Sequence, residues 1–125
     1  MVHGIGIDLV EIPRMARIIK RRQERFLRRV FTPGEIAYCR SKVAPEIHYS
    51  ARFAAKEAFL KSIGVGLAEG IRLADIEVQK SPQAPPILQL HGKAQELLAR
   101  QGIVSWHVSL SHTGDYATAV VILEK

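Results

Sequence analysis

The sequence predicts an α+β fold in which mostly antiparallel strands pack against a long helix. Apolar residues alternate with polar ones in several short segments, as they do in strands, and recur every three or four residues in others, as they do in helices. The two kinds of segment do not follow the regular order of βαβ units. The chain also closes with the pattern of a β-hairpin, which favours antiparallel pairing.

The chain has the size and composition of one domain. Its 125 residues are 47% hydrophobic and contain no repeat or interdomain linker, so residues 1–125 are expected to share one core. The lone cysteine, Cys39, excludes an internal disulfide and is typical of a reducing compartment. No segment resembles a signal peptide or approaches the roughly 20 apolar residues of a membrane span, so a cytoplasmic protein without membrane contact is expected.

A strand and helices are predicted in the first part of the chain. Residues 2–10 have the pattern of a strand, in which apolar residues surround Gly4 and Gly6. Pro13 suits the first turn of the helix that follows. A second helix or turn is predicted at 26–31, where apolar residues recur.

The clearest helix signals lie in the middle of the chain. Residues 32–35 (TPGE) have the pattern of a helix start with a capping box. The longest helix is predicted over residues 45–63 and ends at Gly64, with Gly66 close behind. Its many alanines would let it pack closely on a sheet.

Strands predominate in the last part of the chain. A proline-rich loop at 81–86 separates two of them, and a helix at 93–100 ends at Gly102. The hairpin turns at residues 113–115. The strands are predicted at 74–79, 87–90, 106–111 and 116–123.

Basic residues outnumber acidic ones. There are 18 Lys and Arg against 12 Asp and Glu, which gives a net charge of +6 and a pI near 9.8. Eight of the bases fall within residues 14–29, where only Glu24 opposes them. Such a field favours an acidic partner: nucleic acid, anionic lipid, an acidic protein or a phosphorylated small molecule. If the segment is one helix, a single stripe would contain Arg14, Arg17, Arg21, Arg25 and Arg28.

Two acidic residues interrupt apolar segments, where a carboxylate is costly. Asp8 lies in the first strand, and Glu57 lies in a helix filled with Ala and Phe. If the fold brings them together, they suit a hard divalent cation such as Mg²⁺, which takes one or two carboxylates and phosphate oxygens. Lys61 follows Glu57 by one helical turn, and with Arg52 and Lys56 it would meet phosphate charge.

Each acid also has a simpler interpretation. Asp8 could cap the next helix from the end of its strand. Glu57 and Lys61 could form a solvated salt bridge, as most helical pairs of this kind do. The residues by themselves leave these alternatives open.

Polar residues gather before the hairpin turn. Ser109 and Ser111 are expected to share a strand face, with His112 on the other face or in the turn. A Ser–His nucleophile is disfavoured, because no Gly-x-Ser-x-Gly turn is present. These side chains suit a phosphate or a base edge, although ordinary turn chemistry explains them equally well. His48 is expected on a helix surface, and Cys39 in the core.

Four stretches together resemble the holo-acyl-carrier-protein synthases, the short phosphopantetheinyl transferases. The resemblance covers essentially the whole chain in order. It implies the phosphopantetheinyl transferase fold and transfer of 4′-phosphopantetheine from coenzyme A to a serine of apo acyl carrier protein, which releases adenosine 3′,5′-bisphosphate and supports fatty acid biosynthesis. The stretches are 4–8 (GIGID) with Glu11 and Arg14, 31–35 (FTPGE), 52–61 (RFAAKEAFLK) with Gly64 and Gly66, and 107–113 (HVSLSHT) with Tyr116.

The resemblance also implies roles for single residues. Asp8 and Glu57 would hold Mg²⁺, or Mn²⁺, and Lys61 would contact the pyrophosphate and assist the leaving group. These three would be the catalytic residues, and the proton acceptor would be either a water on the metal or Glu57. Coenzyme A would contact Lys61 together with Arg52, Gly64, Pro86, Ser111, His112 and Thr113.

The resemblance implies partners as well. Arg14, Arg21 and Arg25 fall on the basic helix that docks the acidic carrier, and the family is typically a homotrimer with active sites at its subunit interfaces. One stretch departs from the family. Many relatives have Gly-Lys-Pro before the short strand, where this chain has Ala84-Pro85-Pro86. A phosphate or adenine contact made there would be missing or supplied by another residue.

Two other functions share some of these features. A nucleic-acid-binding module would explain the basic charge but not Asp8 or Glu57, and only 6% of residues are aromatic, which leaves few platforms for stacking bases. A metal-dependent nuclease would need a Glu-x-Lys strand, and Gln79 stands in the place of that lysine after Glu77. Neither nucleic acid nor a membrane is therefore expected as a partner.

Overall fold

The computed structural model describes residues 1–64 and 70–125 and has the expected α+β architecture. Gly66, predicted close behind the end of the long helix, lies outside the described residues. In chain order the elements are β1 (Val2–Glu11), α1 (Ile12–Val30), α2 (Pro33–Arg40), α3 (Pro45–Ile63), the short 3₁₀ helix η2 (Leu73–Asp75), β2 (Ile76–Gln79), β3 (Ile87–Leu90), α4 (Gly92–Arg100), β4 (Ser105–Thr113) and β5 (Tyr116–Glu124).

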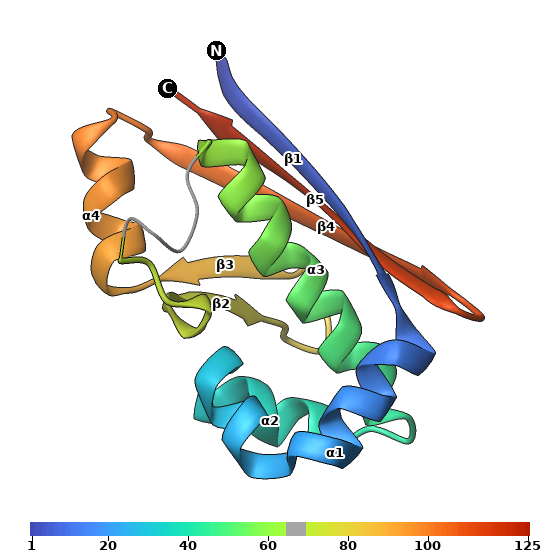
Figure 1. Cartoon of the computed structure of the whole chain (residues 1–125). Coiled ribbons are helices and arrows are strands. Elements are labelled where there is room, and N and C mark those ends of the chain that lie inside the picture. The colour runs from blue at the N-terminus through green and yellow to red at the C-terminus, as the bar shows by residue number, and fades with distance from the viewer. Residues whose placement is uncertain (65–69) are drawn as a thin grey trace.

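A three-stranded antiparallel sheet and α3, which runs along one face of it, form the main layers of the molecule (Figure 1). The strand order of the sheet is β1-β5-β4, so the first strand of the chain pairs with the last. The register places Asp8 opposite Ala119, and Ala119 opposite Leu110. The strands β2 and β3 form a separate antiparallel pair, and the two termini lie side by side at one end of the sheet (Figure 1).

Two glycines on β1, which have no side chains, allow α3 to lie directly against that strand. A Cβ on Gly6 would overlap the carbonyl oxygen of Ala58, and a Cβ on Gly4 would overlap that of Ser62. Ala58 itself is fully buried. Backbone therefore meets backbone here, which is the role that strand glycines serve when another element approaches closely. This contact brings the Glu57 region of α3 next to Asp8.

The predicted start of α2 and both predicted ends of α3 are confirmed. Thr32 and Glu35 form the capping box, in which Thr32 N donates to Glu35 Oε1 over 3.0 Å and Glu35 N donates to Thr32 Oγ1 over 3.1 Å. Helix α3 begins at Pro45 and ends before Gly64, whose φ of 78° lies in the left-handed region. The start of α2 and the end of α3 are both set locally, since each depends on residues within one helical turn.

One strand starts later than the alternation predicts. The prediction ran from 74 to 79, but residues 73–75 form η2, and β2 begins at Ile76. The buried Asp75 side chain accepts a hydrogen bond from Arg72 N over 3.0 Å and folds the chain into a tight turn. Short side-chain bonds of this kind compete with strand pairing.

Lys56 faces the core, which corrects its expected place among phosphate contacts. Its Nζ donates to Glu35 Oε1 over 2.8 Å and to Ile76 O over 2.6 Å, and both charged side chains are fully buried. The second Glu35 oxygen accepts from Val78 N over 3.0 Å. Burial lowers the pKa of Lys56, and the charge of Glu35 opposes that shift. The pair joins α2, α3 and β2 and is not available to a ligand.

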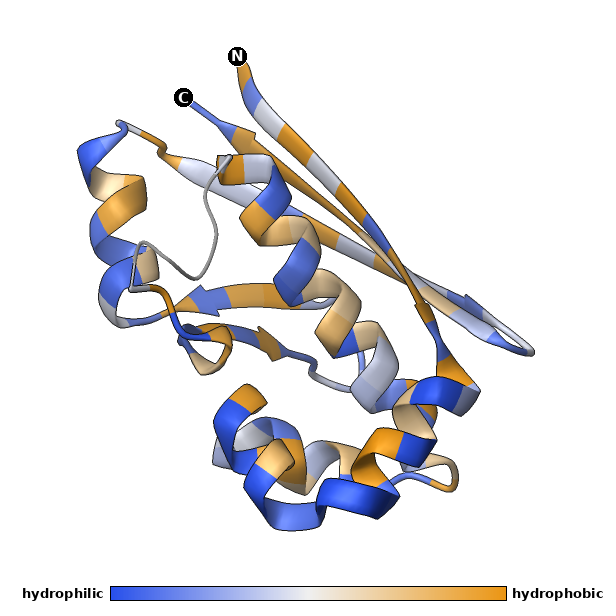
Figure 2. Cartoon of the chain, viewed as in Figure 1, coloured by the Kyte–Doolittle hydropathy of each residue, from blue (hydrophilic) through white to orange (hydrophobic). Residues whose placement is uncertain are grey.

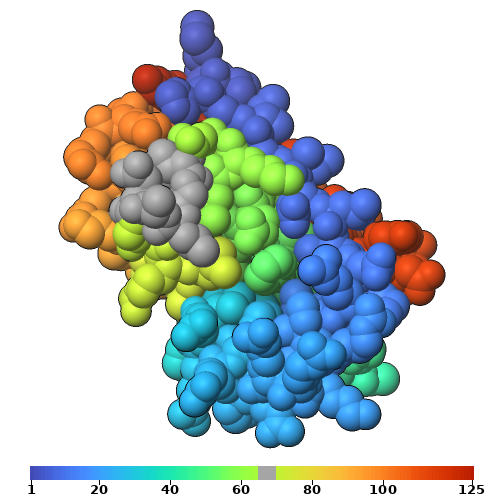
Figure 3. Space-filling model, in the orientation of Figure 1, coloured from blue at the N-terminus to red at the C-terminus, as the bar shows by residue number. Residues whose placement is uncertain are grey.

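Helix α1 is broken in the middle, so the predicted single stripe of arginines is interrupted. Gln23 adopts φ 51° and ψ −134°, which no helical residue adopts. Arg28, beyond the break, pairs with Glu24 at 3.7 Å and no longer continues the line begun by Arg14. Figure 2 shows α1 as largely hydrophilic, and Figure 3 shows α1 and α2 as a block at one end of the molecule.

The sheet has an apolar outer face. On β1 the residues that point away from α3 are Ile5, Ile7 and Leu9, each 63% exposed. On β5, Val120 lies opposite Ile7 and Ile122 lies opposite Ile5. We call these five residues the outer face. Among the described residues, no helix has the length and apolar character that crossing a membrane requires.

Candidate active site

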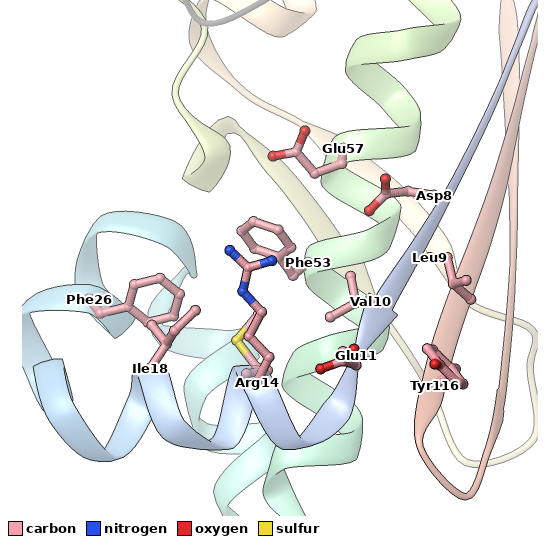
Figure 4. Close-up of a pocket in the computed structure, with 11 residues that line it drawn as sticks. Asp8, Leu9, Val10, Glu11, Arg14, Ile18, Phe26, Phe53, Glu57 and Tyr116 are labelled. Carbon is pink, nitrogen blue, oxygen red and sulfur yellow. The ribbon is translucent and has the colours of Figure 1, made fainter.

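Asp8 and Glu57, the two unexplained acids of the sequence, line one cavity of about 420 Å³. We call it the α1–β1 cavity, because β1 and α1 form two of its walls and α3 forms the third (Figure 4). Asp8 comes from β1, Glu57 and Phe53 come from α3, and Arg14 comes from α1 (Figure 4). The fold therefore brings together side chains that lie up to 49 positions apart in the sequence.

Lys61 contacts Asp8 instead of Glu57. Its Nζ donates to Asp8 Oδ1 and to Ile7 O, over 3.0 Å in each case. The simpler interpretations of the sequence are thus not realised. Asp8 does not cap α1, whose N-cap is Glu11, and no Glu57–Lys61 salt bridge forms.

Glu57 is held in a setting that opposes its ionisation. Partial burial raises its pKa, the charge of Asp8 raises it further, and Lys61 acts in the opposite direction. In the described part of the chain, Glu57 makes no side-chain hydrogen bond, while the Asp8 side chain is 17% exposed. Two carboxylates that repel each other across a cavity gain from a shared cation.

These residues fit a magnesium-type ion. Residues 1–64 and 70–125 contain no group of three Asp, Glu, His or Cys side chains that could form an all-protein metal cage. Mg²⁺ does not need one, since it is usually held by one or two carboxylates with waters and substrate phosphates. Asp8 and Glu57 match that donor set, and a zinc-type site does not fit here.

A second cavity, of about 210 Å³, collects most of the residues expected to contact coenzyme A. We call it the α3–β4 cavity. Arg52 lies on its α3 wall, Ser111 and His112 on its β4 wall, and Pro86 on the loop before β3. Sequence reasoning missed six further lining residues, of which three have polar side chains, namely Tyr38, His48 and Lys80.

Only one of these three had a usable signal. His48 precedes Arg52 by four residues and therefore shares its helix face, although it was expected on the free surface. The structure places His48 half-buried in the cavity. Tyr38 and Lys80 come from other elements, and no local pattern connects them with Arg52.

Lys80 organises the loop that departs from the family pattern. Its Nζ donates to the carbonyl oxygens of Ser81 and Ala84, over 2.6 Å in each case. This holds the loop before Pro86 in place and sets a lysine at the cavity wall. A cation therefore lies beside the stretch where the expected lysine is absent.

The remaining predicted residues lie outside these two cavities or on a neighbouring surface. Gly64 ends α3, and Thr113 ends β4, and neither lines either cavity. Arg21 and Arg25 lie with other arginines around Phe26 on α1. Arg14 lines both this arginine surface and the α1–β1 cavity, and so connects the two.

The two cavities lie on different sides of α3. His48 and Glu57 are nine positions apart, and at about 100° per residue their side chains point in nearly opposite directions. Asp8 and His112 lie on β1 and β4, which are the two edge strands of the sheet with β5 between them. The carboxylate pair and the basic cavity of one chain thus face away from each other.

The site combines a carboxylate pair, an adjacent lysine and a separate basic cavity. Such a combination is typical of enzymes that transfer a phosphate-linked group. The comparisons with known proteins make this class specific. Residues 4–121 match the model of the 4′-phosphopantetheinyl transferase superfamily, and the chain belongs to that family.

Relatives resemble the chain over its full length. A protein of Syntrophus aciditrophicus named holo-[acyl-carrier-protein] synthase is 56% identical over 124 residues, which are 99% of this chain and 97% of the relative. The crystal structure of holo-[acyl-carrier-protein] synthase from Neisseria meningitidis superposes with a TM-score of 0.90 at 32% identity, covering 100% of both chains. The Helicobacter pylori enzyme in complex with coenzyme A gives 0.83 at 35% identity, covering 96% of this chain and 99% of that one.

Proposed function

We propose that this protein transfers 4′-phosphopantetheine from coenzyme A to a serine of apo acyl carrier protein and so supports fatty acid biosynthesis. The observation that carries the proposal is the meeting of Asp8 and Glu57 at one cavity, with Lys61 donating to Asp8, in a chain of this family. Relatives named holo-[acyl-carrier-protein] synthase at up to 56% identity support it. We further propose that residues 1–125 act as one transferase domain, and a cytoplasmic location stays a prediction.

The reaction we propose breaks one phosphorus–oxygen bond and forms another. The serine oxygen of the carrier attacks the phosphorus that bears the pantetheine arm, and adenosine 3′,5′-bisphosphate leaves with the bridging oxygen. The serine proton passes to a base, for which the Glu57 carboxylate, which lines the α1–β1 cavity, is the candidate on this chain. No covalent intermediate with the protein is needed, because the partner supplies the nucleophile.

Asp8 and Glu57 would hold Mg²⁺, or Mn²⁺, in the α1–β1 cavity. The ion, when bound, would neutralise charge on the diphosphate. It would stabilise the transition state by on the order of several kcal/mol. Lys61 Nζ donates to Asp8 Oδ1, and because the Lys61 side chain is 57% exposed it has room to turn toward an incoming phosphate. Its ammonium would then stabilise the negative charge of the leaving group.

The acidic carrier would dock on the arginines of α1. Arg14 reaches both the arginine surface and the α1–β1 cavity, so a partner bound there lies next to the carboxylate pair. Arg21 and Arg25 extend that surface around Phe26. Opposite charge on the two partners raises the rate of encounter, an effect that salt weakens.

We propose that the complete active site forms between copies of the chain, in a homotrimer. One coenzyme A molecule would have to cross α3 to reach both the α3–β4 cavity and the carboxylate pair of a single chain. If the nucleotide instead occupies the α3–β4 cavity of a neighbouring copy, no crossing is needed. The exposed outer face, which includes Ile5, Ile7 and Leu9, offers the apolar surface that such an assembly would bury.

Mass spectrometry tests the transfer itself. Apo acyl carrier protein incubated with this protein, coenzyme A and Mg²⁺ is expected to gain the mass of one phosphopantetheine. Asp8→Ala and Glu57→Ala should each abolish the gain while retaining the fold, as followed by circular dichroism. Carrier protein of unchanged mass with the wild type would refute the proposed function. Full transfer by either variant would remove only the metal assignment.

A further inference from the structure

Cationic side chains from separate segments surround Tyr38 at the α3–β4 cavity. The Arg52 guanidinium carbon lies 4.1 Å from the centre of the Tyr38 ring, and Lys42 Nζ lies 4.6 Å from it. The His48 ring meets the same tyrosine edge-on, with 5.8 Å between ring centres. Among the described residues that line this cavity there is no Asp or Glu.

Arg52 is buried in this cluster, and none of the ion pairs within residues 1–64 and 70–125 includes it. The residue is 2% exposed, and its Nε has no hydrogen-bond partner among the described residues. An unpaired buried cation is costly, and its cost is removed when an anion binds beside it. His112 on β4 and Lys80 on the loop after β2 complete the cationic lining. The cavity is therefore built to receive an anionic group.

His48 responds to the charges of this cavity. Burial lowers its pKa first, and the charges of Arg52, Lys42 and His112 lower it further. Glu46, two positions before His48 on α3, acts weakly in the opposite direction. Without an anion, the net of these effects favours the neutral form of the His48 ring. A phosphate placed among the same cations would change the repulsion at His48 into attraction.

We propose that His48 contacts a phosphate of the bound nucleotide and takes up a proton as that nucleotide binds, so that it helps to select ligands that carry an additional phosphate. This inference rests on the proposed function, since it takes adenosine 3′,5′-bisphosphate, the product of that reaction, as the ligand. The inference adds His48 to the nucleotide site, whereas the sequence analysis expected this residue on a helix surface.

The direction of the pH dependence follows from the charge of His48. Below the pKa of His48 in the free protein, the ring is charged before and after binding, and the contact is present in full. As the pH rises through the higher pKa of the complex, the proton and the contact are lost. Affinity for the bisphosphate should therefore fall as the solution becomes alkaline.

Calorimetry measures this proton uptake directly. Adenosine 3′,5′-bisphosphate and adenosine 5′-monophosphate are each titrated into the wild type near pH 7 in buffers of different ionisation enthalpy. The wild type is expected to take up a fraction of a proton with the bisphosphate and less with the monophosphate. Its preference for the bisphosphate should exceed that of His48→Phe by roughly tenfold near pH 6, the worth of one charge-assisted contact.

Three variants make the result specific to His48. His48→Phe keeps an edge-on aromatic contact with Tyr38, and His48→Gln keeps a hydrogen-bond donor that does not titrate. Both should lose part of the proton uptake. His91→Gln, which removes a histidine paired with Glu77 outside the cavity, should bind as the wild type does. Thermal unfolding confirms that each variant is folded.

Two negative results have different meanings. If His48→Phe shows the same proton uptake and the same preference as the wild type, the role of His48 is refuted while the transferase stands. If the wild type binds neither coenzyme A nor the bisphosphate, and transfers nothing, the proposed function itself is refuted.

Discussion

At the scale of single residues, the Asp8 carboxylate has a partner and the Glu57 carboxylate has none in the described chain. Lys61 donates to Asp8 and leaves Glu57 to face the cavity. The pKa of Glu57 is raised because burial and the charge of Asp8 both disfavour its ionised form. A functional site often retains such a cost, because relieving it removes the chemistry.

We therefore expect Glu57→Gln to stabilise the fold and abolish transfer. Because folding raises the pKa of Glu57, the ionised side chain lowers the stability of the wild type at pH 7. That cost disappears once the pH falls below the pKa that Glu57 has in the unfolded chain. The variant should melt about 2–5 °C higher near neutral pH, and the two proteins should converge in acid. Thermal unfolding followed by circular dichroism measures the difference.

Magnesium provides the control for this prediction. A ligand that binds only the folded state raises its melting temperature. Mg²⁺ should therefore raise the melting temperature of the wild type and leave that of Glu57→Gln nearly unchanged. An equal shift in both proteins would show that the ion binds elsewhere.

At the scale of elements, the contact between β1 and α3 decides where the carboxylates meet. Gly6 has no room for a side chain, since a Cβ there would overlap the Ala58 carbonyl oxygen. Asp8 follows two positions later on the same face of the strand. Any displacement of β1 from α3 thus moves Asp8 relative to Glu57.

Gly6→Ala should therefore cost both stability and activity. Overpacking of this kind typically costs about 1–3 kcal/mol, and the upper end is expected because rigid backbone opposes the new methyl group. Urea unfolding measures the stability, and the carrier assay measures the transfer. Gly114→Ala is the matched control, since a Cβ at Gly114 meets nothing within 4 Å and should change stability by about 0.5 kcal/mol or less. Wild-type stability in Gly6→Ala would contradict the close contact.

Helix α1 carries its arginines on two segments, with the break at Gln23 between them. Arg14 lies on the first segment, at the wall of the α1–β1 cavity, and Arg25 lies on the second. Arg14 and Arg25 each line a surface hollow that also contains Phe26. The break therefore bends the basic surface without dividing it. A partner that docks on α1 meets Arg14 closest to the carboxylates.

Charge reversal at Arg14 should weaken the docking of the carrier. Arg14→Glu is expected to raise the apparent KM for the carrier protein by roughly tenfold or more and to change that for coenzyme A little. Arg100→Glu on α4 alters the net charge equally at a distant exposed site and serves as the control. Steady-state kinetics at several salt concentrations would test both. An equal effect of Arg14→Glu on the two substrates would mean that α1 is not the docking surface.

At the scale of the whole molecule, the two halves of the site face away from each other. Asp8 lies on one edge strand and His112 on the other, and α3 stands between their cavities. The outer face leaves Ile7 63% exposed on the side of the sheet away from α3. Both features are explained if copies of the chain assemble in a ring in which unlike surfaces meet.

Sedimentation should therefore show a trimer, and Ile7→Asp on the outer face should dissociate it and greatly reduce transfer. An active wild-type monomer would refute the interfacial site. Thr118→Ser, on the neighbouring strand opposite Leu9, is a control that leaves the apolar residues of that face intact.

Mixing two inactive variants tests whether copies share a site. Asp8→Ala lacks the metal side, and His112→Ala lacks a nucleotide contact. Trimers co-expressed from equal amounts of both should recover about a quarter of wild-type activity, because one arrangement in four places an intact Asp8 against an intact His112. A mixture that stays as inactive as its components would show that each chain acts alone.

Much of the fold was predictable because its signals are local. The capping box at Thr32 and the left-handed Gly64 mark their helix ends within one turn. Asp8 and Glu57 were also found in the sequence, since each is a charged residue in an apolar segment. The sequence also predicted a second helix or turn at 26–31 after the helix that starts near Pro13, and the break at Gln23 lies between these two segments. The position of the break was not predicted, because glutamine carries no preference for positive φ.

The sequence by itself determined most of the elements, the two candidate carboxylates and the family resemblance, which depend on residue types and on short spacing. That Asp8 and Glu57 line one cavity was decided by the tertiary structure. Only the tertiary structure decided that Lys61 pairs with Asp8, that Lys56 is buried against Glu35, and that the two cavities open on different sides of α3. The physical reason is the range of the interactions. Capping and periodicity act within a few residues, whereas the burial of a charge depends on distant segments that packing alone brings together.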